Sequence, residues 1–191
     1  MESPEWTHQR YFRQFRLNVE QYGEILVAAA FEGDKLGDAQ PCFDIRASKK
    51  AVHGALVSGA VAADQSTACL GEALELRIEV KSKLSWTGTG RANVIHCRNK
   101  FESVRGQPPA THLAFLLFDG AKTGMATHAY LLSCDAAMSL RRMDTKSQYI
   151  PVPAVCRAGA AAMPGIVDIT ALINGVAQRP LRHLSASLAV T

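Results

Sequence analysis

The sequence lacks any C-x-x-C pair, and its five cysteines are scattered and odd in number. They are Cys42, Cys69, Cys97, Cys134 and Cys156. This spacing argues against a zinc knuckle or a disulfide framework and indicates reduced thiols in an intracellular protein. No segment approaches the ~20 apolar residues of a membrane-spanning helix, and the polar opening MESPEWTHQRYFRQFR is unlike a signal peptide. We therefore expect a cytoplasmic protein with no membrane partner.

Several catalytic signatures are missing as well. There is no G-x-S-x-G, no G-x-x-x-x-G-K-[ST] and no H-E-x-x-H, so the sequence indicates no α/β-hydrolase, P-loop NTPase or zincin. The G-x-G within TGTGRA lacks its third glycine and is a weak signal for a phosphate-binding loop. Charge is not extreme, because 21 Lys and Arg against 17 Asp and Glu give a net charge of +4. This excess permits a nucleic-acid partner and is equally typical of an ordinary surface.

A chain of 191 residues, 48% of them hydrophobic, can bury a substantial core. We predict one domain over 1–191, with its core at about 8–140 and a C-terminal appendage at about 141–191. Hydrophobic periodicity predicts the order of its elements. They are a helix over 8–31, a strand over 42–47, a strand or hairpin over 51–64, a loop over 64–72, a strand over 73–84, a helix over 91–104, a buried strand over 111–119, its antiparallel partner over 125–133, a helix over 134–143, an extended segment over 147–153, and one or two helices over 165–177. This order predicts an α/β fold with a mixed β-sheet flanked by helices.

The clearest strand is ALELRIEVKSKL, which alternates between apolar and charged residues. Its apolar face comprises Leu74, Leu76, Ile78 and Val80, and its charged face comprises Glu75, Arg77, Glu79 and Lys81. Glu79 and Lys81 are two residues apart and therefore lie on the same face. They form either a solvated ion pair worth less than ~1 kcal/mol or one wall of a metal-dependent active site.

Two further acids could belong to such a metal-dependent active site. Asp44 lies on the strand CFDIRA, and pairing of that strand with ELRIEVKSK would bring Asp44 and Glu79 together at the edge of the sheet. Two carboxylates, a main-chain carbonyl and waters suit Mg²⁺, which requires octahedral oxygen ligands. Lys81, roughly 6–7 Å along the strand from Glu79, would orient or help to deprotonate a metal-bound water. Glu24, inside the first helix, could add another oxygen ligand.

The segments QYGEILVAAAF, QPCFDIRA and ELRIEVKSK together resemble the PD-(D/E)xK nuclease superfamily, which has the restriction-endonuclease-like fold. In that family a helix carries a Glu, often in a Gly-Glu step, an Asp follows on the first core strand, and E-x-K lies on a later strand. Glu24, Asp44 and the step from Glu79 to Lys81 occupy these places. The resemblance covers roughly residues 10–135 and implies a restriction-endonuclease-like α-β-β-β-α-β core.

The resemblance also implies roles for these residues. Asp44 and Glu79 would bind Mg²⁺, Lys81 would assist the nucleophilic water, and Glu24 would support the metal site. The implied reaction is hydrolysis of a phosphodiester bond in DNA to a 5′-phosphate and a 3′-hydroxyl.

Basic residues outside this set are candidates for contacts with DNA phosphates. They are Lys83, Arg91, Arg98, Lys100, Arg141 and Arg142. Arg141 and Arg142 could also read bases, because arginine can bond guanine through two hydrogen bonds. A solvated surface is an equally ordinary explanation for each of them.

These observations favour a Mg²⁺-dependent endodeoxyribonuclease acting on double-stranded DNA, most simply a type II restriction enzyme. Cleavage of both strands of a palindromic site would be served by a homodimer. A repair or recombination nuclease is the near alternative. A non-catalytic nucleic-acid-binding or assembly domain of the same fold is the alternative from another class.

Overall fold

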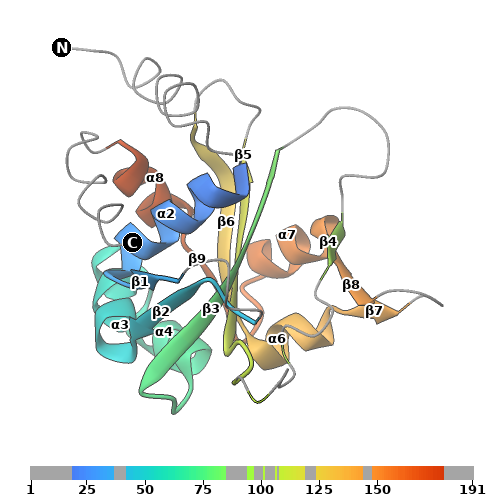
Figure 1. The fold of residues 1–191 in the computed structure, drawn as a ribbon, viewed down its shortest axis with the longest axis horizontal. Helices are drawn as coiled ribbons and strands as arrows, with labels where there is room; N and C mark the ends of the chain where they lie inside the picture. The colour runs from blue at the N-terminus through green and yellow to red at the C-terminus, as the bar shows by residue number, and fades with distance from the viewer. Residues whose placement is uncertain are drawn as a thin grey trace.

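A mixed sheet of six strands forms the centre of the structure (Figure 1), a computed structural model that describes residues 19–36, 42–84, 94–96, 101, 106, 108–118, 124–143 and 148–178. The strand order is β1-β2-β3-β5-β6-β9. The bounds are β1 (Asp34–Lys35), β2 (Ile45–Ser48), β3 (Glu75–Leu84), β5 (His112–Phe118), β6 (Ala126–Ser133) and β9 (Ile166–Asp168). β3 pairs in parallel with β5, whereas the other neighbouring strands are antiparallel.

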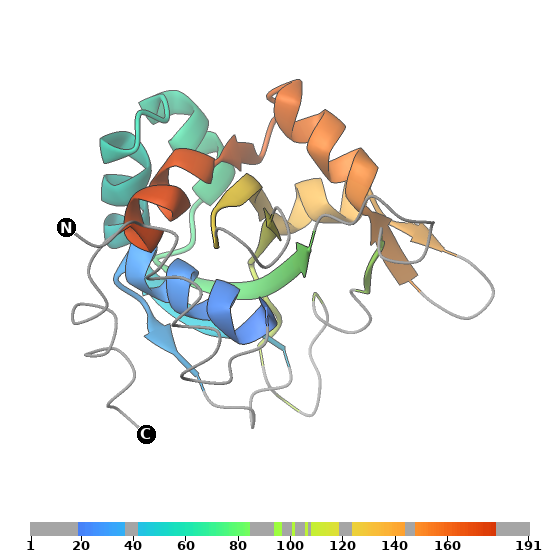
Figure 2. The same cartoon turned by 90° about the horizontal axis from the view of Figure 1, so that it is seen from above.

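Helices cover both faces of this sheet (Figure 2). One face packs against α2 (Val19–Phe31), α3 (Lys49–Ser58), α4 (Ala63–Leu70) and α8 (Thr170–Ala177), and the other against α6 (Cys134–Ser139) and α7 (Val152–Ala160). β5 contributes to both cores, since Ala114 and Leu116 face the first and Leu113 and Phe115 the second. The predictions of a strand buried on both faces and of a mixed sheet flanked by helices are therefore confirmed.

The region between β2 and β3 differs from its prediction. The strand or hairpin predicted over 51–64 is wrong because most of these residues form α3, and the loop predicted over 64–72 is mostly α4. The Ser48 hydroxyl accepts a hydrogen bond of 3.2 Å from the backbone three residues on and caps α3. Val52 and Leu56 are buried one helical turn apart. A cap and this spacing stabilise a helix despite its valine and glycine content.

A second sheet of three strands also departs from the prediction. β4 (Val94–His96), β8 (Gln148–Pro151) and β7 (Arg142–Met143) pair in the order β4-β8-β7. The helix predicted over 91–104 is therefore wrong at 94–96, because pairing with a strand some 50 residues later along the chain determines the conformation there. The extended segment over 147–153 is confirmed as β8 up to Pro151, after which α7 begins.

The segment from residue 141 contributes to the same sheet and core as the preceding chain. β9 pairs with β6, and α8 packs in the first core. The Asn174 amide both donates to the Ala126 carbonyl (2.9 Å) and accepts from the Ala126 N–H (2.8 Å). Thr170 likewise accepts from the Ala129 N–H at 2.8 Å. These side chains are hydrogen-bond partners for backbone groups of β6 that lie beyond the end of β9.

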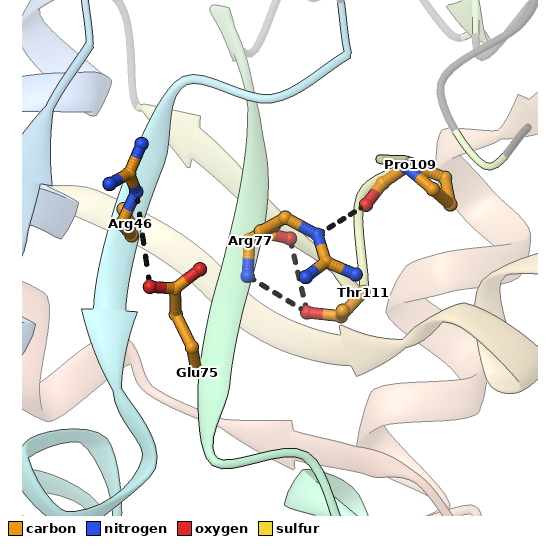
Figure 3. Close-up of polar contacts among 5 residues, drawn as sticks. All are labelled: Arg46, Glu75, Arg77, Pro109 and Thr111. Atoms are coloured by element: carbon orange, nitrogen blue, oxygen red, sulfur yellow. Dashed lines mark hydrogen bonds and ion pairs between the residues drawn. The ribbon is translucent and has the colours of Figure 1, made fainter. Parts of the chain in front are cut away.

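Polar contacts fix the start of β3 against the segment that leads into β5 (Figure 3). The Arg77 N–H donates to the Thr111 hydroxyl at 2.9 Å, and the Thr111 N–H donates to the Arg77 carbonyl at 2.8 Å. The Arg77 Nε donates to the Pro109 carbonyl at 2.7 Å. Leu74, predicted at the start of the apolar face of this strand, is 87% exposed and precedes β3, which begins at Glu75.

None of the helices in the described parts of the chain is long and apolar enough to cross a membrane.

Candidate active site

Glu79 and Lys81 lie side by side on β3, as the alternation predicts. Glu79 is only 1% exposed, and the Lys81 Nζ lies 2.5 Å from its Oε1. The Lys81 side chain is 22% exposed. The alternative of a solvated pair is therefore wrong for Glu79, although the ion pair itself forms. A carboxylate held inside the fold beside an ammonium group is a more costly arrangement than a surface pair.

Asp44 immediately precedes β2 and lies beside the stretch of β3 that carries Glu79. The pairing of β2 with β3 begins at Ile45, which pairs with Ile78. The Asp44 N–H donates to the Ile78 carbonyl at 3.0 Å, and the Asp44 Oδ2 accepts from the Val80 N–H at 2.7 Å. The side chain of Asp44 thus continues the hydrogen-bond ladder along β3 and is fixed by it. The strand that follows Asp44 therefore pairs with the strand that carries Glu79, but Asp44 itself, predicted within the strand over 42–47, lies just before β2.

Glu24 reaches the same region from α2. The Glu24 Oε2 lies 3.0 Å from the Nζ of Lys35, on β1. Burial raises the pKa of Glu24 above its ordinary value, and the charge of Asp44 adds to this, while Lys35 and Lys81 act in the opposite direction. Glu24 therefore lies within electrostatic reach of both Asp44 and Lys81.

Close packing of α2 on β3 positions Glu24. A Cβ atom added to Gly23 would lie 1.8 Å from the Oγ of Ser82 on β3. Only a residue without a side chain permits this approach, which provides a physical reason for the Gly-Glu step noted in the sequence. Ser82 is buried, and within the described part of the chain its hydroxyl has no hydrogen-bond partner.

Lys81 carries the positive charge of the site. Burial disfavours its charged form, but attraction and hydrogen bonding to Glu79, together with the charges of Asp44 and Glu20, outweigh burial and raise its pKa above the ordinary value. Lys81 is therefore an ammonium group at neutral pH, suited to donating hydrogen bonds and balancing negative charge.

The structure places the basic candidates in different regions. Lys83 is partly buried two residues beyond Lys81 on the same face of β3. Arg141 follows α6 and Arg142 lies in β7, on the three-stranded sheet, away from α2 and β2 in both views (Figures 1 and 2). The remaining three, Arg91, Arg98 and Lys100, lie outside the described residues. Among the basic candidates that the structure describes, only Lys83 shares a strand with one of the acids, Glu79.

Two charged residues of this region were not predicted. Glu20 precedes Glu24 by one helical turn, and this spacing could have indicated it from the sequence. Lys35 gave no such signal, because its segment was interpreted as the irregular end of a helix. Its position depends on the pairing of β1 with β2, which is a long-range contact.

The donor set contains Asp44, which bonds to the backbone of Ile78 and Val80 on either side of Glu79, Glu79 itself, and Glu24 within electrostatic reach of Asp44. Among the described residues no group of three or more His, Cys, Asp and Glu side chains is arranged to hold a metal ion. Two carboxylates nevertheless suit Mg²⁺, which is commonly bound by one or two carboxylates, water and substrate phosphates.

A scan of the sequence against protein-family models gave no match, and a search of curated proteins gave none either.

Proposed function

We propose that the protein is a Mg²⁺-dependent endonuclease that hydrolyses phosphodiester bonds in double-stranded DNA. The observation that carries the proposal is the buried Glu79 with the Lys81 ammonium 2.5 Å away, and Asp44 hydrogen-bonded to Ile78 and Val80 on either side of Glu79. A buried acid paired with a lysine beside a second acid is costly to maintain for stability alone. The pKa values of the neighbouring Glu24 and Lys81 are both raised, and perturbed ionisable groups of this kind are typical of a functional site.

The order of elements supports a restriction-endonuclease-like core within this proposal. α2, β1 and β2 follow one another, β3 comes after the interposed α3 and α4, and β5 comes later in the chain and lies beside β3. This agrees with the α-β-β-β-α-β order that the resemblance implies, except for its second helix. The pair α3 and α4 fills the long interval between Asp44 and Glu79.

The residues of the site would divide the work of hydrolysis. Asp44 and Glu79 would hold Mg²⁺, which supplies a polarised water and neutralises charge on the phosphate. Lys81, being protonated, would orient the attacking water and balance the charge that develops on the phosphoryl oxygens. Glu24, kept in place by Lys35, would hydrogen-bond water on the side of Asp44.

Within this activity we propose a type II restriction enzyme acting as a homodimer, since a palindromic site is cut on both strands. A repair or recombination nuclease would use the same chemistry. These two assignments differ in their cleavage products, so a single experiment separates them.

The test is digestion of plasmid and phage DNA by the purified protein in Mg²⁺ and in EDTA. Glu79→Gln and Lys81→Ala should abolish cleavage. Glu75→Gln, on the same face of β3, and Lys50→Ala, at an exposed position of α3, are the controls and should retain most of the activity. Loss of activity in all four variants would indicate a general effect on folding.

The products then decide between the assignments. Discrete bands that require both Mg²⁺ and Glu79 would support the restriction enzyme, whereas a smear with the same requirements would leave a nuclease of another kind. DNA that binds but stays intact in every metal tested would refute the nuclease and favour a binding domain.

A further inference from the structure

Two arginines lie beside the acids on the same face of the sheet. Arg46 of β2 is the register partner of Arg77 of β3; Asp44 precedes Arg46 by two residues, and Glu79 follows Arg77 by two residues. Two residues correspond to roughly 6–7 Å along a strand. Like charges placed directly opposite each other destabilise an antiparallel pair, so their placement calls for an explanation beyond stability.

The two guanidinium groups have different surroundings (Figure 3). Arg77 turns toward the β5 side, where its Nε donates to the Pro109 carbonyl at 2.7 Å. Arg46 points away from β3, and its Nε lies 4.0 Å from the Oε2 of Glu75, with the two side chains 47% and 51% exposed. An ion pair this long and this exposed contributes little. Arg77 is thus held in place, whereas Arg46 is available to another anion.

We propose that Arg46 binds a backbone phosphate of the nucleic acid and so positions the strand against Asp44 and Glu79. The inference rests on the nuclease function proposed above and adds a substrate-binding residue to it. Arg46 lies two residues along the chain from Asp44, which immediately precedes β2. It would therefore engage a phosphate next to the one that is cleaved.

Charge and geometry favour this role for an arginine. The carboxylates Glu24, Asp44 and Glu79 repel a polyanion, and a nearby guanidinium offsets that repulsion. Its planar group can donate two parallel hydrogen bonds to one phosphate, which fixes direction as well as distance. A backbone contact is independent of base sequence, so the role of Arg46 should be the same on every duplex.

The test measures binding of a short fluorescein-labelled DNA duplex by anisotropy, in EDTA so that the strand is not cut, over a series of salt concentrations. Arg46→Gln should weaken binding about tenfold and reduce the slope of log K against log salt by about 0.9, the value for one phosphate contact. Arg46→Lys should keep that slope. In cleavage assays Arg46→Gln should raise KM with little change in kcat.

Arg77→Gln is the matched control. It should lower the thermal midpoint of unfolding, because the Pro109 contact is lost, and leave the salt slope of binding unchanged. Glu75→Gln should strengthen binding, because it removes a competing carboxylate from Arg46.

The outcomes separate this inference from the function on which it rests. An unchanged salt slope in Arg46→Gln, together with cleavage that still requires Mg²⁺ and Glu79, would overturn the role of Arg46 and leave the nuclease intact. A wild-type protein that neither binds nor cleaves DNA would overturn both.

Discussion

Gly23 of α2 lies against Ser82 of β3, so closely that a Cβ atom on residue 23 would be 1.8 Å from the serine Oγ and 3.0 Å from its Cβ. Ser82 is 1% exposed and has apolar neighbours on its face of β3. Because Glu24 follows Gly23 directly, the contact that packs the helix on the sheet also sets the distance of Glu24 from Asp44. The packing of α2 on β3 and the position of Glu24 in the candidate site therefore depend on the same contact.

Gly23→Ala should destabilise the protein. The added methyl group forces Ser82 to rotate and the helix to move away from β3, and overpacking of this kind costs about 1–3 kcal/mol. The higher helix propensity of alanine recovers up to ~1 kcal/mol of that loss. Urea unfolding should show a net decrease in the free energy of unfolding.

A second substitution tests whether the steric contact is the cause. In a Ser82→Gly background the methyl group of Gly23→Ala has room, so the double variant should be no less stable than Ser82→Gly alone. Equal effects of Gly23→Ala in both backgrounds would show that another contact is responsible.

Lys81→Met should destabilise the protein more than its partial exposure suggests. It removes the ammonium group beside the buried Glu79 carboxylate, and breaking a buried pair from one side costs up to about 3–5 kcal/mol. Since the Lys81 side chain is 22% exposed, we expect the lower end of that range. Thermal or urea unfolding at neutral pH measures the effect.

The double variant Glu79→Gln/Lys81→Met provides the control. It removes both charges, so its stability should recover most of what Lys81→Met loses. If the double variant instead loses as much free energy of unfolding as the two single variants together, the ion pair does not couple the two positions.

The sequence was sufficient to predict β3, β5 and β6, since their alternation or continuous apolarity follows from which faces are buried. The pairing of the strand near Asp44 with the strand of Glu79 entered only as a condition, and the structure shows that β2 pairs with β3 from Ile45 onward. The hydrogen bond from Val80 to Asp44 could not be derived in the same way, because it depends on where β2 stops.

Other features depend on contacts between distant segments. Lys35 meets Glu24 only because β1 pairs with β2 beneath α2, and Val94–His96 form a strand only because β8 lies beside them. α3 was missed for a local reason, since its valines favoured a strand. Serine is a favoured N-cap residue, and Ser48 directly precedes α3, so a local helix signal is present in the sequence.

Mg²⁺ should stabilise the wild-type protein through its carboxylates, because a ligand that binds only the folded state raises the midpoint of unfolding. Asp44→Asn should reduce this stabilisation. The amide oxygen of asparagine can still accept the Val80 N–H bond, so the local structure is retained while one negative charge is lost. Thermal unfolding with increasing MgCl₂ measures the shift without any assay of activity.

Glu75→Gln is the control for that measurement. It removes an acid that is 51% exposed on the same face of β3, so the Mg²⁺-dependent shift should match that of the wild type. A shift that is unaffected by Asp44→Asn would place the cation elsewhere.

His112 should make the protein less stable in mild acid. Its side chain is 3% exposed, its Nε2–H donates to the Cys69 carbonyl at 3.0 Å, and burial lowers its pKa below the ordinary 6.5. Above about pH 6.5 the imidazole is neutral in both the folded and the unfolded chain. Below that pH the unfolded chain binds a proton that the folded chain does not, so the free energy of unfolding falls, by up to about 1.4 kcal/mol per pH unit, until the lowered pKa is reached.

The comparison that isolates this effect is urea unfolding of the wild type and of His112→Gln between pH 7.5 and pH 5, a range chosen to lie mostly above the titration of carboxylates. Glutamine can still donate to the Cys69 carbonyl, and the other histidines are present in both proteins. The variant should be less stable at pH 7.5 but lose less stability on acidification than the wild type. Parallel pH profiles would mean that His112 binds its proton equally well in the folded and unfolded chains, which a buried imidazole between Cys69 and Thr111 should not do.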